Sequence, residues 1–103
     1  MANELRLNDI GVPIRFTMKE PDGTIFPIDG ATTLTVYLKK PSGSLLTKTA
    51  SLYTDGTDAK LQYVLATGDL DELGGWQAQA YVDKGGYKVR SKIVKFKVEP
   101  ILT

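Results

Sequence analysis

Three carboxylates within four positions, Asp69, Asp71 and Glu72, are the residues of this chain whose spacing first suggests chemistry. A pair of carboxylates can act as general acid and general base. The same residues are also typical of the start of a short helical turn, in which Asp69 caps the first amides and Glu72 completes a capping box before Gly74. We therefore interpret them as structural and predict no catalytic residues. The two apolar residues of this turn should point into the core: Leu70 and Leu73.

Other chemistries lack their usual residues. The chain has no histidine, which removes the commonest general base and the commonest metal ligand. It has no cysteine either, so thiolate catalysis, thiolate metal sites and disulfides are excluded. A calcium ion would need several carboxylates around one point. Four aspartates could meet there, but their spacing matches no full calcium-loop signature: Asp55, Asp58, Asp69 and Asp71. We predict no metal and no cofactor.

A basic stripe near the C-terminal end is the remaining candidate for chemistry. Its members are Lys88, Arg90, Lys92, Lys95 and Lys97, with Tyr87 beside them. A nucleic-acid groove uses such a composition. Lysines that alternate on the solvent face of a strand also protect the strand from pairing with other chains. Because 13 basic and 12 acidic residues give a net charge of only +1, we favour the solvent-face interpretation and predict no nucleic-acid partner.

Length and composition fit one small domain. The chain has 103 residues, of which 42% are hydrophobic and 24% charged. We predict a single domain over residues 1–103, with residues 1–8 as an N-terminal arm and residues 100–103 as a C-terminal tail. Glu4 and Arg6 stand where a secretory signal needs an apolar run, and no window is long enough to span a membrane. We predict no membrane partner.

Strand patterns run along most of the chain. Turn signals recur at the spacing of an all-β domain, at residues 21–23, 28–30, 41–43, 54–56, 74–75 and 83–86. Between them, apolar and polar residues alternate with the period of a strand that buries one face. The predicted inner faces are Ile14, Phe16 and Met18; Leu34, Val36 and Leu38; Leu61, Tyr63 and Leu65; and Trp76, Ala78, Ala80 and Val82.

Two further segments complete this pattern. The first, Leu45–Tyr53, is rich in Ser and Thr and is predicted as an edge strand. Its predicted inward residues are Leu46, Ala50 and Leu52. In the second, the apolar parity set by Tyr87 and Val89 switches to that of Val94, Phe96 and Val98. A β-bulge near residues 91–93 would account for the switch.

About seven strands in a chain of this length leave few all-β folds. We predict an immunoglobulin-like β-sandwich of about seven antiparallel strands, with Trp76 near the place where such domains usually carry a corner tyrosine. A small closed barrel of the oligonucleotide-binding type is the alternative. That barrel would need a longer helix between its third and fourth strands, and the sequence contains no such helix.

Several phrases of the sequence resemble one family. An apolar strand and an acidic Gly turn occur at Pro13–Thr24, a Leu/Ile-x-Gly-Ala-Thr phrase at Ile28–Thr32, and a Lys-Lys-Pro-x-Gly turn at Lys39–Gly43. Together with the later spacing of Gly74, Trp76, Ala78 and Val82, they resemble the N-terminal domain family of phage baseplate upper proteins. The resemblance covers roughly Asp9–Val98 and consists of turn and core patterns, which specify a fold better than a role.

The resemblance implies a setting. In that family the domain is an immunoglobulin-like docking module that holds a receptor-binding or baseplate protein to the particle. It implies that this chain is a non-enzymatic virion structural protein, assembled in the host cytoplasm, whose candidate partners are other virion structural proteins and further copies of itself. A capsid decoration protein is one alternative. An adhesion or carbohydrate-binding module, which would present Tyr53, Tyr81 and Tyr87 to a glycan, is the other.

Interface candidates can also be named from exposed apolar residues. Ile25–Ile28 is an apolar run beside a turn, in which Ile28 is expected in the core and Phe26 at an interface. Ile101 and Leu102 place two large apolar residues in the C-terminal tail. Strand addition to the open edge at Leu45–Tyr53 is a concrete way for a neighbouring chain to bind.

Overall fold

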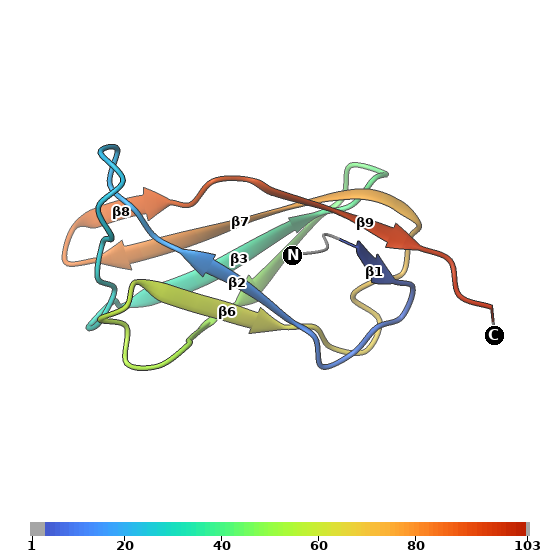
Figure 1. Cartoon of the computed structure of the whole chain (residues 1–103), viewed down its shortest axis with the longest axis horizontal. Helices are drawn as coiled ribbons and strands as arrows, with labels where there is room; N and C mark the ends of the chain where they lie inside the picture. The colour runs from blue at the N-terminus through green and yellow to red at the C-terminus, as the bar shows by residue number, and fades with distance from the viewer. Residues whose placement is uncertain (1–3, 103) are drawn as a thin grey trace.

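The computed structural model describes residues 4–102, and in that range the chain is all-β, as the sequence predicts (Figure 1). The described residues form nine strands: β1 (Glu4–Arg6), β2 (Pro13–Thr17), β3 (Thr33–Lys39), β4 (Leu45–Thr49), β5 (Ser51–Leu52), β6 (Lys60–Val64), β7 (Gly74–Lys84), β8 (Tyr87–Arg90) and β9 (Val94–Glu99). Within residues 4–102 there is no helix of the length and apolarity that crossing a membrane requires.

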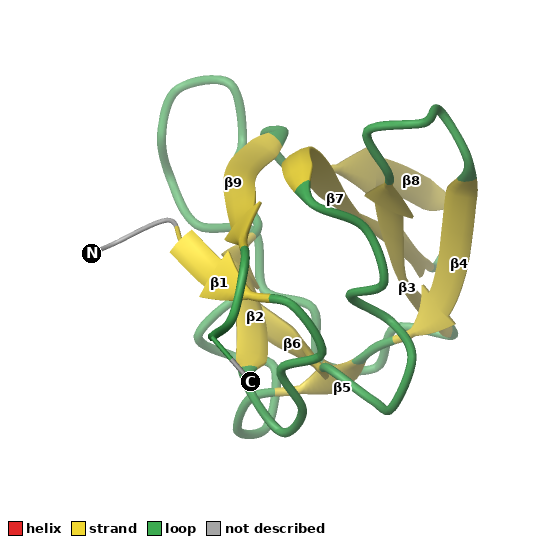
Figure 2. Cartoon of the chain, turned by 90° about the vertical axis from the view of Figure 1, so that its right-hand side faces the viewer, coloured by secondary structure: helices red, strands yellow, loops and turns green. Residues whose placement is uncertain are grey.

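The strands pair into two sheets. One has six strands in the order β1-β9-β7-β3-β4, with β8 also paired to β7, and the other has three in the order β2-β6-β5. Figure 2 shows the two sheets on either side of a shared interior. A closed barrel would pair its strands in one continuous ring, whereas the described strands divide into two separate sets.

The strand count and pairing differ in part from the expectation of about seven antiparallel strands. Of the seven strand pairings among residues 4–102, six are antiparallel, but β1 pairs with β9 in parallel. The N-terminal arm expected at residues 1–8 therefore contains a sheet strand at residues 4–6, while its residues 1–3 lie outside the described part of the chain, as does Thr103 of the tail. Residues 100–102 form no regular structure.

The predicted edge segment Leu45–Tyr53 contributes one strand to each of the two sheets. Its first part, β4, pairs with β3 at the end of the six-stranded sheet, and its second part, β5, pairs with β6 at the end of the three-stranded sheet. Ala50, between the two strands, is buried, and Leu46 and Leu52 pack against the core. The prediction of an edge strand with these inward residues is confirmed, and the chain changes sheet at Ala50.

One hydrophobic core lies between the apolar sides of the two sheets. The inner faces predicted by alternation are buried, apart from Leu34 and Tyr63, which are half-buried and pack against the core. Trp76 is 1% exposed and stacks on Phe96 with ring centroids 5.9 Å apart. Ile28 is fully buried, as expected.

A β-bulge separates β8 from β9, as the parity switch predicts. Both strands pair with β7, and residues 91–93 lie opposite only residues 79–80 of that strand. The extra residue is accommodated by Ser91, whose amide donates to the Ala80 carbonyl (3.0 Å). The Ser91 hydroxyl oxygen accepts the Ala80 amide proton (2.9 Å) and donates to the carbonyl of Lys92 (2.8 Å). The side chain therefore replaces the ladder bond that the bulge removes.

The helical turn predicted at Asp69–Leu73 is absent, and this prediction is wrong. Asp69 does not cap the amides that follow it, because its carboxylate accepts the amide proton of Ala66, three residues earlier (2.8 Å). Glu72 does not complete a capping box. Its carboxylate instead accepts the hydroxyl proton of Ser42, 30 positions earlier in the sequence (3.0 Å). Leu70 is buried as predicted, but Leu73 is 51% exposed. Tertiary partners here outweigh the local capping preference.

Candidate functional site

Two of the predicted interface residues meet at one end of the molecule. The rings of Phe26 and Tyr87 lie edge to face, with centroids 5.9 Å apart and an interplanar angle of 65°. The Lys84 ammonium lies 5.9 Å from the centre of the Phe26 ring. Tyr87 is 65% exposed and Ile25, next to Phe26, is 44% exposed. We call Ile25, Phe26, Lys84 and Tyr87 the aromatic patch.

The β7–β8 hairpin supplies one side of the aromatic patch. Gly85 and Gly86 connect the two strands, both with positive φ (55° and 90°), which is the conformation that a two-residue hairpin turn requires. The turn predicted at residues 83–86 is confirmed. Because the turn has only two residues, it fixes Tyr87 directly opposite Lys84 in the ladder.

Backbone hydrogen bonds hold the other side of the patch in place. The amide of Phe26 donates to the Met18 carbonyl (2.9 Å), and that of Ile28 donates to the Gly56 carbonyl (2.9 Å). Lys84 reaches across from the hairpin and donates to the carbonyl of Pro27 (3.0 Å). The loop that carries Phe26 is therefore fixed against the hairpin, and the aromatic pair is preorganised.

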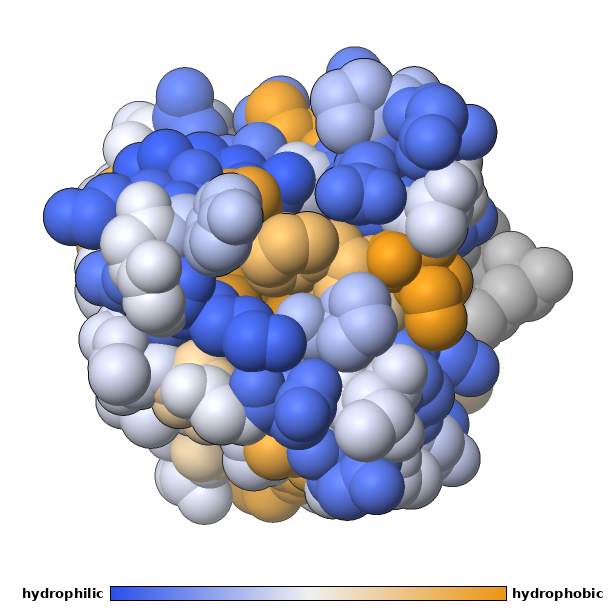
Figure 3. Space-filling model, turned by 90° about the vertical axis from the view of Figure 1, so that its left-hand side faces the viewer, coloured by the Kyte–Doolittle hydropathy of each residue, from blue (hydrophilic) through white to orange (hydrophobic). Residues whose placement is uncertain are grey.

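The surroundings of the patch are hydrophilic. Figure 3, which looks onto the end of the molecule that bears the β7–β8 turn, shows a hollow with apolar side chains at its centre and hydrophilic ones around it. An exposed apolar centre with a polar rim is typical of protein interaction sites. The two rings and the aliphatic side chain of the patch suit contact with an apolar surface of another molecule, and the patch also carries one ammonium group.

The other two tyrosine candidates lie elsewhere. Tyr81 pairs with Arg90 across the β7–β8 ladder, and the Arg90 guanidinium lies 4.7 Å from the centre of its ring. Tyr87 faces Lys84, three residues from Tyr81 along β7, so Tyr81 and Tyr87 project from opposite faces of the sheet. Tyr53 follows β5 in the three-stranded sheet. The structure therefore gathers no platform of three tyrosines.

The two tail candidates form a separate exposed site. Ile101 is 42% exposed and Leu102 is fully exposed. They follow β9 at the end of the molecule opposite the β7–β8 turn (Figure 1). They do not join the aromatic patch.

The carboxylates considered for calcium or for catalysis have separate partners. Asp55 accepts bonds from the hydroxyl (2.6 Å) and the amide (3.0 Å) of Thr57, and these bonds lower the pKa of Asp55. Asp58 accepts from Thr54 (2.9 Å) and Asp71 pairs with Lys40 (2.9 Å). Within residues 4–102, no three acidic side chains gather around one point.

Asp69 is a polar residue that lies buried beside the core, and its carboxylate has partners on several sides. Its carboxylate accepts the Tyr63 hydroxyl proton and the Ala66 amide proton and lies 3.1 Å from the Lys48 ammonium. Burial works to raise the pKa of Asp69, but these hydrogen bonds and the Lys48 charge outweigh it, so the pKa lies below its usual 3.8. Burial, together with the neighbouring Asp69 charge, raises the pKa of Tyr63 to about 12. The sequence pattern gave no sign of this cluster, because its members come from three separate segments.

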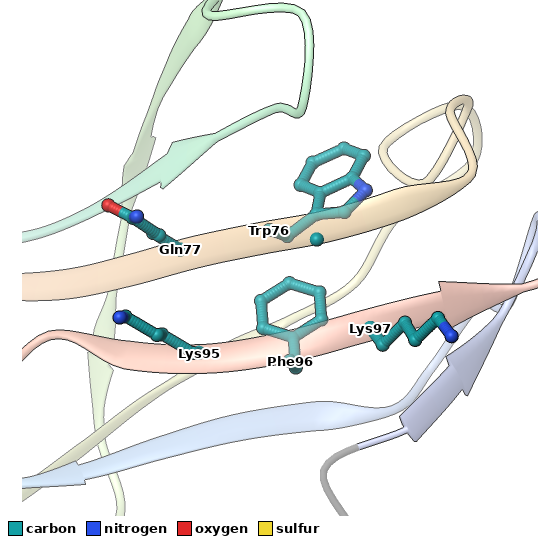
Figure 4. Close-up of a pocket in the computed structure, with 6 residues that line it drawn as sticks. Trp76, Gln77, Lys95, Phe96 and Lys97 are labelled. Atoms are coloured by element: carbon teal, nitrogen blue, oxygen red, sulfur yellow. The ribbon is translucent and has the colours of Figure 1, made fainter.

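A shallow depression of about 540 Å³ lies over β7 and β9 (Figure 4). It exists because Gly75 has no side chain and no atom lies within 4 Å of the place a Cβ would take. The neighbouring rings, Trp76 and Phe96, are 1% and 7% exposed and belong to the core. What borders the depression from the solvent side is an amide and two ammonium groups: Gln77, Lys95 and Lys97. These groups supply neither a carboxylate nor a hydroxyl for acid–base chemistry.

A second hollow, larger than the depression over β7 and β9, was not predicted. A groove of about 740 Å³ runs between β2 with its following hairpin loop and the bulge between β8 and β9. Four basic residues line it: Arg15, Lys19, Arg90 and Lys92. We call it the basic groove. The sequence placed Arg90 and Lys92 in the basic stripe, but nothing in the spacing could join them to Arg15 and Lys19, about seventy positions earlier.

No protein-family model matches this chain, and no curated protein matches it significantly.

Proposed function

We propose that this chain is a non-enzymatic docking module of a bacteriophage particle, an immunoglobulin-like β-sandwich that binds other virion structural proteins. The observation that carries this proposal is the aromatic patch, in which the exposed ring of Tyr87 packs against the half-buried ring of Phe26, 61 positions away in the sequence, on one preorganised surface. Such an aromatic anchor is typical of the residues that supply most of the binding energy of an interface.

The strand order supports the immunoglobulin-like assignment. In that fold one sheet contains strands B, E and D and the other contains C, F and G, with C′ added beside C in variable-type domains. The order β2-β6-β5 fits B-E-D, and the order β9-β7-β3-β4 fits G-F-C-C′. The Trp76 indole also donates to the Glu72 carbonyl four residues upstream (3.1 Å), a backbone bond like the one a corner tyrosine makes.

The phage setting is supported by the resemblance of residues 9–98 to the baseplate upper protein family. A tail, baseplate or capsid-surface position is compatible with the same docking role, and a capsid decoration protein remains the nearest variant of this proposal. The carbohydrate-binding alternative has less support. It requires Tyr53, Tyr81 and Tyr87 to share one platform, and they lie in three places.

The proposal is tested by asking whether the chain is part of the particle. Virions produced from a genome that carries this gene would be purified by density gradient and analysed by quantitative mass spectrometry. We expect the chain at a constant copy number per particle. A chain that stays in the lysate while complete virions form without it would overturn the proposal.

The role of the aromatic patch is tested by Tyr87→Ser, and this is our first prediction. Loss of an anchoring tyrosine weakens binding by about 2 kcal/mol or more, so we expect the purified variant to bind chain-depleted virions about thirtyfold more weakly. Leu73→Ser is the matched control, since Leu73 is 51% exposed at the other end of β7. A dimer in light scattering that Tyr87→Ser dissociates would instead assign the patch to self-association.

A further inference from the structure

The basic groove has an open strand edge along one side. β2 pairs only with β6, and the backbone bond from the Met18 amide to the Ala59 carbonyl extends the same register. In an antiparallel pair, alternate residues turn their backbone groups toward the partner strand. Ile14 and Phe16 therefore bond to β6, while the amides and carbonyls of Arg15 and Thr17 point the other way, into the groove.

The fold explains why this edge is open. In the immunoglobulin-like arrangement that we propose for this chain, a strand A lies beside strand B. Here the first described strand, β1, pairs with β9 of the other sheet, and no described strand lies on the free side of β2. The open edge of β2 thus corresponds to a strand position that residues 4–102 do not fill.

The charges around the groove are not neutralised. None of its four basic side chains forms an ion pair with a carboxylate within residues 4–102, and the single acidic residue that lines it is Glu20. Arg15 is held instead by neutral groups: its Nε donates to the Gln62 amide oxygen (3.1 Å), and its guanidinium lies 4.4 Å from the centre of the Tyr53 ring. The positive charge is positioned but has no counter-charge.

We propose that the basic groove binds an extended acidic segment of a partner protein, which adds as a strand to the free edge of β2 and places its carboxylates beside Arg15, Lys19 and Lys92. Backbone bonds to Arg15 and Thr17 supply the ladder, and acidic residues at alternate positions supply the cross-strand charge pairs. This inference rests on the proposed docking function and names the chemistry of one partner segment.

An acidic peptide fits the groove better than a nucleic acid. Sequence-tolerant binding of single strands depends on aromatic faces on which bases stack. The aromatic residue that lines the groove, Phe16, is 4% exposed and belongs to the core. A phosphate backbone also lacks the alternating amides and carbonyls that would continue a β-ladder. Only a polypeptide uses both the charges and the strand edge.

The test measures binding of a fluorescent synthetic peptide in which glutamate alternates with valine. In the variant Lys19→Gln/Lys92→Gln we expect affinity to fall about tenfold or more, the loss of two close charge pairs. The matched control is Lys88→Gln/Lys95→Gln, which removes the same charge from exposed strand residues outside the groove and should change the affinity less than about threefold. Equal loss in both variants would overturn the proposal.

Two further probes separate strand addition from general anion binding. A peptide with the same charge but with N-methylated alternate amides should bind at least about tenfold more weakly, because it cannot complete the ladder. Binding of this peptide as tight as that of the parent, or tighter binding of oligothymidylate, would show a polyanion surface and overturn the proposal.

If the chain is found in virions but binds no acidic peptide, only this inference fails. If the chain binds the acidic peptide but is absent from virions, the proposed role of the basic groove stands and the proposed phage function fails.

Discussion

At the scale of single residues, the structure shows close contacts that the sequence pattern could not. Gly56 is an example: it is one of many turn glycines in the sequence, but in the folded chain it lies against the backbone of the loop that carries the aromatic patch. A Cβ at this position would stand 2.6 Å from the Asp29 nitrogen and 2.8 Å from its Cα. The loop can approach only because residue 56 has no side chain.

We therefore predict that Gly56→Ala destabilises the protein far more than a matched glycine substitution. Gly23 is the control, because its φ is also 91° but nothing lies within 4 Å of its Cβ position. Both variants should lose about 1–2 kcal/mol for the left-handed conformation, and Gly56→Ala should lose about a further 2 kcal/mol for overpacking. Urea unfolding of the two variants measures the difference. Equal losses would mean that the loop moves away freely.

At the scale of elements, the alternation of apolar and polar residues predicts the strands, and the one predicted helical turn failed because its residues have partners elsewhere in the fold. Period-two patterns predicted the inner faces of β2, β3 and β7, because each of these strands buries one side in the core. The helical turn at Asp69–Leu73 failed as a prediction because the capping residues there bond to Tyr63 and Ser42, which are distant in the sequence or precede the turn. Local propensity is overridden where such partners exist.

The β8–β9 bulge carries an element-scale prediction. Ser91→Ala removes the oxygen that accepts the Ala80 amide proton, and Ala80 is fully buried. A buried amide left without a partner should lower the free energy of unfolding by about 1–3 kcal/mol. Ser91→Thr keeps the hydroxyl and should recover most of the loss. Ser51→Ala, at an exposed serine of β5, should change stability by less than about 0.5 kcal/mol in the same urea titration.

At the scale of the whole molecule, the Asp69 cluster links the two sheets. Asp69 lies in the β6–β7 connection and joins Lys48 on β4 of one sheet to Tyr63 on β6 of the other. Within residues 4–102, no buried side-chain nitrogen or oxygen lacks a hydrogen-bond partner, so the polar link does not leave an unpaired group in the core. The cluster is therefore a structural clamp between the sheets.

The titration of this clamp gives a prediction at alkaline pH. The pKa of Tyr63 rises from 10.0 to about 12 in the folded chain, so its contribution to stability is complete below pH 10 and is lost as the pH rises toward 12. We expect wild type to lose about 1–3 kcal/mol relative to Tyr63→Phe across this window. Tyr37→Phe is the control, since the Tyr37 hydroxyl makes no hydrogen bond within residues 4–102. Parallel pH profiles for wild type and Tyr63→Phe would contradict the prediction.

At acid pH the stability of the protein depends on Asp69, and it falls as the pH decreases rather than as it increases. Because the pKa of Asp69 is lowered on folding, its contribution is present above its usual value of 3.8 and is lost as the pH falls through the lower folded-state value. Wild type should therefore lose its advantage over Asp69→Asn at low pH.

Whole-molecule features were the least predictable from sequence. Alternation shows which side of a strand is buried, but it does not show which strand lies next to it. The all-β class, the core and the edge strand could be predicted, whereas the parallel pairing of β1 with β9 and the basic groove could not. Phe26 and Tyr87 were each predicted as exposed candidates, and only the fold shows that they meet.

The bulge at residues 91–93 also limits how this sequence can change by insertion or deletion. Lys88 and Arg90 reach solvent at even positions, and Lys95 and Lys97 do so at odd positions, because the extra residue shifts the alternation between them. Removing one residue here would turn β8 or β9 over and drive lysines into the place of Phe96 or Val89. Homologous chains should therefore keep the length of this segment constant.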